Sequence, residues 1–334
     1  MASTYLSQKP VQPVQTTSEL GMRSRADITI IILTFNEEIH IERCLKSAFQ
    51  IAKHVLIVDS FSTDLTVSFA ERMGALVWRH EFLNHAGQLA WALEKLPIIT
   101  PWVMRLDADE VISPELAENL LSRLVNAAPY VNGFLVCRYV RFMGGLIRHG
   151  NFPQWTLRIW RRGQATIEQR WMDEHMVLKA GRTEPINGDF IDDNLNTITW
   201  WTSKHNAYAS REAIDLLNSK YAFLDKKDEL GNLNRQARYK RWLKENLYAR
   251  LPLGLRAFTY FVYRMIFQLG VLDGRSGFVF HFLQGFWYRY LVDVKVWEVE
   301  RRMREEEIGC VEAIRNVLGV NFPNESDVVN KSSR

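Results

Sequence analysis

The stretch that decides the fold of this 334-residue chain is residues 102–110, WVMRLDADE. Its apolar residues suit a buried strand, and the run ends in three carboxylates. Ser113, Pro114 and Glu115 then predict the start of a helix, because serine is a good N-cap, proline fits the first helical position and glutamate suits the first turn. The acids therefore stand at the carboxyl end of a strand, where open α/β sheets bind ligands.

Two of these acids suggest a metal site. Asp107 and Asp109 are two residues apart, so on an extended backbone they would share one face. Two hard oxygen ligands suit Mg²⁺ or Mn²⁺, and such an ion can carry a diphosphate. A solvated acidic turn explains the same residues, because two acids at this spacing are common by chance. The sequence around them decides between the two interpretations.

Two similar units precede this stretch. Residues 28–33 and 54–58 are apolar runs that each end in a polar turn, and such runs are typical of buried parallel strands. Spaced apolar residues after each turn predict helices, and a third strand over 75–78 precedes a helix over 86–96. The alternation predicts a doubly wound α/β sheet with the polar turns at one edge.

The composition agrees with a globular protein. Hydrophobic residues make up 47% of the chain, enough for a large core, and the formal net charge is only +4. Residues 1–26 are polar and lack an apolar period, so we expect a disordered tail there and a frayed tail over 323–334. Cys44, Cys137 and Cys310 are too far apart for a disulfide framework or a zinc site, which favours a reducing compartment.

Three motifs, in this order, resemble those of the family 2 glycosyltransferases: TFNEE at 34–38, VDSFSTD at 58–64 and LDADE at 106–110. The chain is most similar to the bacterial lipopolysaccharide-core and exopolysaccharide transferases. The resemblance implies the GT-A fold, a doubly wound mixed sheet flanked by helices that binds nucleotide sugars, over residues 27–230. The chain departs from the family at Ser60, where a second aspartate is usual, and at Phe61, where glycine is usual. The signature of processive synthases is absent, which favours the transfer of one sugar.

The resemblance also implies roles for individual side chains. The residues implied to bind the donor nucleotide are Thr34, Asn36, Glu37, Asp59, Ser60, Asp107 and Asp109. Asp109 is implied to bind a divalent metal ion, Mg²⁺ or Mn²⁺, with Asp107 beside it on the ribose or sugar side. Such an ion would stabilise the negative charge of the leaving diphosphate. The turns after the first two strands are also explained by ordinary helix capping.

An inverting transferase needs a base that deprotonates the acceptor hydroxyl. Glu174 matches the acidic base motif of the family best, and Asp173 is the second candidate. The alternative for this pair is a solvated bend between short strands. Arg158 could reach a phosphate of the donor, although an arginine on a strand can equally extend its head to solvent.

The amino-acid composition of the chain changes over residues 231–322. Between 235 and 256 there are seven basic residues and one acid, and two apolar, aromatic-rich segments follow. No uncharged run reaches the ~20 residues that a membrane-spanning helix needs. We therefore expect helices that lie on an anionic membrane surface or pack as a helical subdomain.

These observations predict an inverting, metal-dependent glycosyltransferase that moves one sugar from a nucleotide-sugar donor to a membrane-associated glycan, of lipopolysaccharide core or lipid-linked type. The predicted location is cytoplasmic, peripheral to the inner face of the cell membrane. One alternative is a nucleotidyltransferase, which would normally have a glycine-rich basic loop after the first strand. The other is a non-enzymatic membrane-surface binding protein. Nucleic acid is not an expected partner, because the basic residues are confined to one segment.

Overall fold

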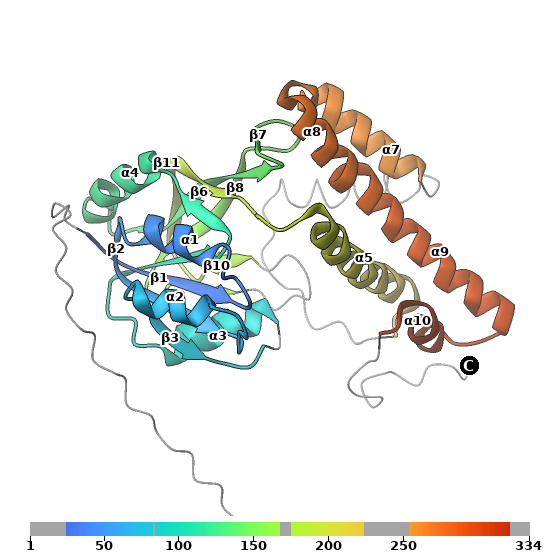
Figure 1. Cartoon of the computed structure of the whole chain (residues 1–334), viewed down its shortest axis with the longest axis horizontal. Helices are drawn as coiled ribbons and strands as arrows, with labels where there is room; N and C mark the ends of the chain where they lie inside the picture. Colours follow the sequence, from blue (N-terminus) through green and yellow to red (C-terminus); the bar gives the residue numbers. More distant parts are fainter. Residues whose placement is uncertain (1–24, 83, 168–174, 224–253, 321–334) are drawn as a thin grey trace, which may run out of the picture. The chain divides into compact units, whose positions relative to one another are not determined.

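The structure is a computed structural model, and it describes residues 25–82, 84–167, 175–223 and 254–320 (Figure 1). The chain divides into two compact units. The first unit comprises residues 1–137 and 155–191, and the second comprises residues 138–154 and 192–334. The predicted tails fall largely outside the described residues.

One half of the sheet in the first unit is parallel. Its strands, in spatial order, are β3 (Leu76–Arg79), β2 (Ala52–Asp59), β1 (Ala26–Thr34) and β4 (Trp102–Asp107). The register pairs Thr34 with Asp59 and Leu33 with Asp107. The turns after β1, β2 and β4 therefore meet at the same edge, as the sequence predicts.

The helices of this unit cover both faces of the sheet. They are α1 (Ile41–Ala48), α2 (Thr66–Arg72), α3 (His85–Lys95) and α4 (Pro114–Val125). Alternate residues of β1 enter different cores, because Ile30 packs in the cluster that contains Leu45 of α1, whereas Ile31 packs in the cluster that contains Leu89 of α3. Each such buried side chain contributes about 1.5–3 kcal/mol. The Ser113 cap is confirmed, since its side chain accepts a hydrogen bond from Leu116 N.

Further strands complete the sheet. They are β5 (Glu110–Ile112), β6 (Val131–Phe142), β7 (Gly145–Ile147), β8 (Gln154–Arg161) and β11 (Arg182–Asp192), and a separate pair is formed by β9 (Ala165–Ile167) and β10 (Met176–Leu178). The strand β8 runs antiparallel to β4, with Ile159 opposite Met104. The predicted fold class, a doubly wound mixed sheet flanked by helices, is confirmed.

The second unit is mainly helical. Its helices are α5 (Ile198–Tyr221), α7 (Leu255–Val262), η2 (Tyr263–Phe267), η3 (Gly270–Asp273), α8 (Gly274–Phe280), η4 (His281–Trp287), α9 (Tyr288–Glu306) and α10 (Cys310–Leu318). The helix α5 packs against α9 through Ala209, Ala213 and Val292. The first helix of this unit begins at Ile198, before residue 231, where the sequence predicts the start of the helical region. Among the described residues, no helix is long and apolar enough to cross a membrane.

A buried carboxylate, Asp273, fixes a loop of the second unit. It accepts hydrogen bonds from the backbone N–H groups of Arg148 at 3.2 Å and His149 at 2.9 Å. Its Oδ1 also lies 2.7 Å from His149 Nδ1. Burial alone would raise the pKa of Asp273, but these hydrogen bonds outweigh burial and lower the pKa. The loop is therefore anchored by a carboxylate that is charged at neutral pH.

We expect Asp273→Asn to lower the free energy of unfolding by about 1–3 kcal/mol at pH 7, because the amide cannot replace a charged acceptor of several hydrogen bonds. The stabilisation from a lowered pKa is complete above the unfolded value, near pH 4, and is lost as the pH falls through the folded value. Urea unfolding between pH 3 and 7 measures this. The exposed Asp27→Asn is the matched control. Equal unfolding midpoints for Asp273→Asn and wild type would contradict the anchoring role.

Candidate functional site

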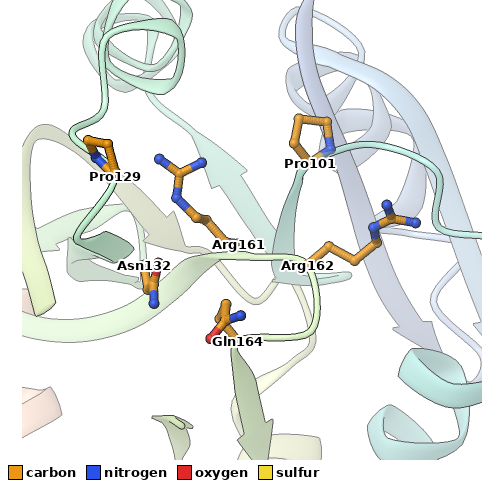
Figure 2. Close-up of a pocket in the computed structure, with 6 residues that line it drawn as sticks. All are labelled: Pro101, Pro129, Asn132, Arg161, Arg162 and Gln164. Carbon is orange, nitrogen blue, oxygen red and sulfur yellow. The ribbon is translucent and has the colours of Figure 1, made fainter. Parts of the chain in front are cut away.

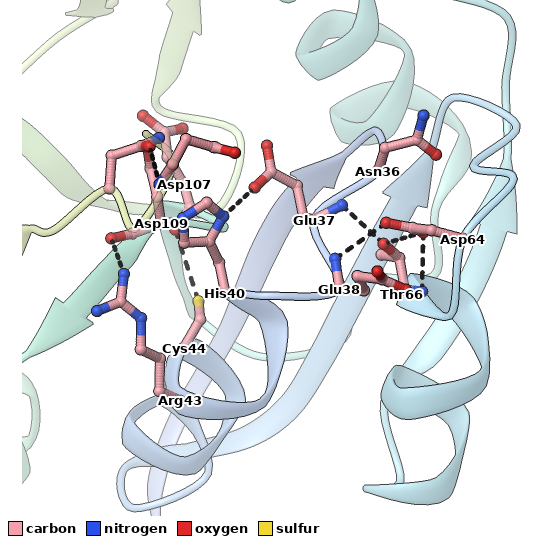
Figure 3. A network of polar contacts seen from close by, with 12 residues as sticks. Asn36, Glu37, Glu38, His40, Arg43, Cys44, Asp64, Thr66, Asp107 and Asp109 are labelled. Carbon is pink, nitrogen blue, oxygen red and sulfur yellow. Dashed lines mark hydrogen bonds and ion pairs between the residues drawn. The ribbon is translucent and has the colours of Figure 1, made fainter. Parts of the chain in front are cut away.

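The turns after β1 and β2 are joined by hydrogen bonds (Figure 3). Glu37 N donates to Thr66 Oγ1 at 2.7 Å, and Glu38 N donates to Asp64 Oδ2 at 3.1 Å. Figure 3 shows Glu37 turning its carboxylate away from these contacts and toward His40, whose Nδ1 lies 2.5 Å from Glu37 Oε2. The two turns thus form one network at the carboxyl edge of the sheet.

Asp59 and Thr34 are buried within this edge. Asp59 Oδ1 accepts hydrogen bonds from Thr34 Oγ1 at 2.9 Å and from Ser62 Oγ at 2.5 Å. Asp59 Oδ2 accepts a hydrogen bond from Ser62 N at 2.8 Å. Both side chains hold the ends of β1 and β2 together, and their contact with a nucleotide stays a prediction.

Asn36 and Ser60 lie nearer the surface of the same edge. Asn36 has a φ of 54°, which asparagine tolerates better than most residues, and its Oδ1 accepts a hydrogen bond from Thr63 N at 2.9 Å. Ser60 Oγ accepts a hydrogen bond from Gln88 Nε2 at 3.0 Å. Gln88 is a buried residue of α3 that sequence reasoning missed, because its partner is 28 positions away.

Asp107 and Asp109 do not share the face of an extended strand, so that expectation is wrong. β4 ends at Asp107, and Asp109 lies in the turn that leads into β5. The physical reason is Glu110, whose buried Oε2 accepts a hydrogen bond from Asp107 N at 2.8 Å and so draws the chain into a turn. Both aspartates are half-buried, and Arg43 Nη2 donates to the backbone oxygen of Asp109 at 3.4 Å.

Two arginines surround the carboxylate of Asp107. Arg105 Nε lies 3.1 Å from Asp107 Oδ1, and Arg158 Nη1 lies 3.6 Å from Asp107 Oδ2. Burial alone would raise the pKa of Asp107, but the two guanidinium groups outweigh burial and hold the pKa well below its usual range. Asp107 is therefore ionised at every physiological pH, with part of its charge already balanced.

Arg158 is the partner of a buried ion pair. Its Nη2 lies 2.8 Å from Glu110 Oε1, and its guanidinium stacks over Phe190 at 4.6 Å from the ring centre. Arg158 is 7% exposed, so the alternative in which its head extends to solvent is wrong. Contact with a donor phosphate stays a prediction. Glu110 was not singled out from the sequence, although it directly follows the two aspartates.

The predicted base candidates, Glu174 and Asp173, lie outside the described residues. Their neighbour His175 is exposed at the start of the next described segment. The assignment of the base to Glu174, with Asp173 as the second candidate, therefore stays a prediction from the sequence.

Asp107 and Asp109 offer oxygen ligands for a divalent ion. In the part of the chain that the structure describes, no group of three or more His, Cys, Asp or Glu side chains is placed to hold a metal ion. A complete protein cage is not required, because Mg²⁺ is usually bound by one or two carboxylates together with water and substrate phosphates. Half-buried Asp107 and Asp109 fit that kind of site.

A pocket lies at the opposite end of β4 from Asp107 (Figure 2). It is lined by Pro101, Pro129, Asn132, Arg161, Arg162 and Gln164, none of which is a predicted site residue. Arg161 Nε donates to the backbone oxygen of Val131 at 2.9 Å, and its guanidinium stacks over Trp102 at 4.5 Å. Arg161 is thus engaged in holding the sheet, and the pocket is separate from the candidate site.

Comparison with known proteins gives a family and relatives. Residues 29–190 match the model of "Glycosyl transferase family 2". An uncharacterised glycosyltransferase of Rickettsia conorii is 40% identical over 93 residues, which cover 28% of this chain and 32% of that protein. The lipopolysaccharide core biosynthesis glycosyltransferase LpsC of Rhizobium meliloti is 31% identical over 153 residues, which cover 44% of this chain and 55% of LpsC. The chain thus spans between about a third and about half of these relatives.

Two solved structures are also similar to this chain. The mannosyltransferase PcManGT of Pyrobaculum calidifontis, in complex with GDP-Man and Mn²⁺, is 16% identical, with a TM-score of 0.49 over 82% of this chain and 88% of that one. The glucosyl-3-phosphoglycerate synthase of Mycobacterium tuberculosis, in complex with Mn²⁺, UDP and glucosyl-3-phosphoglycerate, is 22% identical, with a TM-score of 0.29 over 35% of this chain and 45% of that one.

Proposed function

Residues 29–190 belong to glycosyl transferase family 2, and from this premise we propose that the chain is an inverting, metal-dependent glycosyltransferase. It moves one sugar from a nucleotide-sugar donor to a membrane-associated acceptor, a lipopolysaccharide core or another lipid-linked glycan. The observation that carries the proposal is the position of Asp107, the last residue of β4, and of Asp109 in the turn after it, at the same sheet edge as the joined turns after β1 and β2.

The donor nucleotide binds at this edge. Its base and ribose contact residues of the two joined turns, namely Thr34, Asn36, Glu37, Asp59 and Ser60. Asp107, kept ionised by Arg105 and Arg158, accepts hydrogen bonds from hydroxyl groups on the ribose or sugar side. Asp109 would hold the divalent ion. When bound, Mg²⁺ or Mn²⁺ stabilises the negative charge that develops on the leaving diphosphate.

The alternatives explain fewer of these features. A nucleotidyltransferase would normally present a glycine-rich, basic loop after β1, whereas the chain has TFNEE there. The alternative of a non-enzymatic membrane-surface protein leaves the joined turns and the two aspartates unexplained. A thermal-shift panel of nucleoside diphosphates with Mn²⁺, compared with single-stranded nucleic acid, separates the two enzymes from the binding protein, which should ignore the nucleotides. Screening nucleotide sugars with a membrane fraction as acceptor then identifies the transfer, and a protein that neither binds nor turns over any of them is not a glycosyltransferase.

Glu174→Gln tests the proposed base. We expect it to lower the rate of transfer by roughly 10²- to 10⁴-fold, because the amide cannot accept the proton of the acceptor hydroxyl. Affinity for the nucleoside diphosphate should change little, and calorimetry measures it beside turnover. The exposed Glu118→Gln is the matched control. Normal turnover in Glu174→Gln together with an inactive Asp173→Asn would move the role to Asp173.

A further inference from the structure

The second unit carries a large exposed apolar surface on the consecutive segments α7, η2, η3, α8 and η4. We call it the apolar face, and its most prominent members are Phe258, Ile266, Phe267, Leu272, Phe278 and Phe282. Their exposed fractions run from 40% for Phe282 to 75% for Phe267. Single exposed apolar residues are ordinary, but a contiguous group of large ones marks an interaction surface.

The aromatic rings of this face are ordered by packing on one another. Phe278, Phe282, Phe286 and Tyr290 follow at intervals of four residues, with ring centres 6.4, 5.6 and 5.8 Å apart. Phe261 of α7 packs against the first three of them at 6.0 to 6.3 Å. One side of this ladder is held in place, and the other side is exposed.

The exposed charge on these segments is a single cation, Arg275 of α8. Residues 254–293 contain four arginines and two acids, Asp273 and Asp293. Arg264 is buried, Arg256 pairs with the buried Asp293, and Arg289 pairs with Glu212. The carboxylate of Asp273 is buried and engaged by the loop at 148–149, whereas Arg275 is exposed. Within these described residues, the face therefore presents apolar rings and one exposed cation, Arg275, without an exposed carboxylate.

We propose that the apolar face docks on the surface of an anionic lipid bilayer. The exposed rings and aliphatic side chains enter the boundary between headgroups and acyl chains, and Arg275 meets lipid phosphates at the rim. Helices that are too short and interrupted to cross the bilayer can lie in its plane in this way. The inference rests on the proposed function, since an acceptor held in a membrane would be reached from such a docked position.

Vesicle flotation of the full chain tests the apolar part of the proposal. The test variant carries Ile266→Gln, Phe267→Gln and Leu272→Gln. We expect its partition onto phosphatidylglycerol–phosphatidylcholine vesicles to fall at least about 10-fold. The matched control carries Ile99→Gln, Val125→Gln and Tyr130→Gln, at first-unit positions that are 59% to 82% exposed. The control should partition as wild type does. Circular dichroism establishes that all three proteins are folded.

A second pair of variants tests the electrostatic part of the proposal. Arg275→Glu should lower partition onto the anionic vesicles by roughly 5-fold or more, and should leave partition onto pure phosphatidylcholine unchanged. Arg182→Glu reverses an exposed charge of the first unit and should leave partition onto both kinds of vesicle unchanged.

Three results would overturn the proposal. Wild-type protein could fail to float with anionic vesicles, which would indicate that another part of the chain covers the face. The triple Gln variant of the face could float as wild type does. Sedimentation could show a dimer that this variant dissociates, which would assign the face to a second copy. Nucleoside diphosphate binding, measured by calorimetry on the same samples, separates the two hypotheses: a protein that docks through this face but binds no nucleotide refutes the proposed function alone.

Discussion

Asp109→Asn abolishes most of the sugar transfer while the protein stays folded: this is the largest effect on activity that we expect. The asparagine keeps the shape of the side chain but removes the negative charge that holds the divalent ion. Loss of one group that stabilises developing charge costs on the order of 10²–10³-fold in rate. Turnover of the donor measures the loss. Wild-type activity should also disappear in excess chelator and return with Mg²⁺ or Mn²⁺.

The control for this prediction is Glu115→Gln, which neutralises an exposed acid in the first turn of α4. It should transfer sugar at the wild-type rate. Transfer that continues undiminished in excess chelator would rule out the metal-dependent mechanism, whatever the behaviour of the aspartate variant.

The largest effect on stability is expected at Glu110. Glu110→Ala leaves the buried Arg158 without its closest carboxylate and removes the acceptor of Asp107 N. Removing one partner of a buried ion pair typically costs about 3–5 kcal/mol, because the other charge remains buried. Urea unfolding measures the loss. The activity should fall as well, since the turn that carries Asp109 is held by the same carboxylate.

A double variant separates charge from packing. Glu110→Leu with Arg158→Met removes both charges, and such replacements of a buried pair by apolar residues are often neutral for stability. We expect the double variant to recover much of the stability but not the activity, because Asp107 loses one of its two arginines. If Glu110→Ala unfolds at the wild-type urea concentration, the pair contributes little and our account of the turn is wrong.

The parallel half of the sheet could be predicted because its signals are local. The continuous apolar run of β1 and the Ser113-Pro114 helix start each need only their neighbours in sequence. The strand β11, in contrast, has the sequence RTEPINGDFID, whose proline, glycine and charges are typical of a loop. It is a strand because β6 and β5 lie on either side of it. Pairing partners of this kind leave no periodic signal in the sequence.

The same limit applies to the candidate site. The motifs predicted which acids gather at the sheet edge, but not that Asp107 would be held by arginines or that Asp109 would lie in a turn. Those differences depend on Glu110 and Arg158, which are 48 positions apart. Neither residue had a pattern around it that marked a buried ion pair.

The joined turns after β1 and β2 have a thermodynamic consequence. Their backbone is held by hydrogen bonds to side chains of the protein itself, namely Asp59, Thr66 and Asp64. The conformational entropy of these residues is therefore lost when the chain folds, and a nucleotide that binds here does not have to order them again. Such preorganisation makes the edge a rigid template. Under the proposed function, discrimination between nucleotides would rest on shape and hydrogen-bond complementarity with that template, and not on how well each nucleotide can induce a structure.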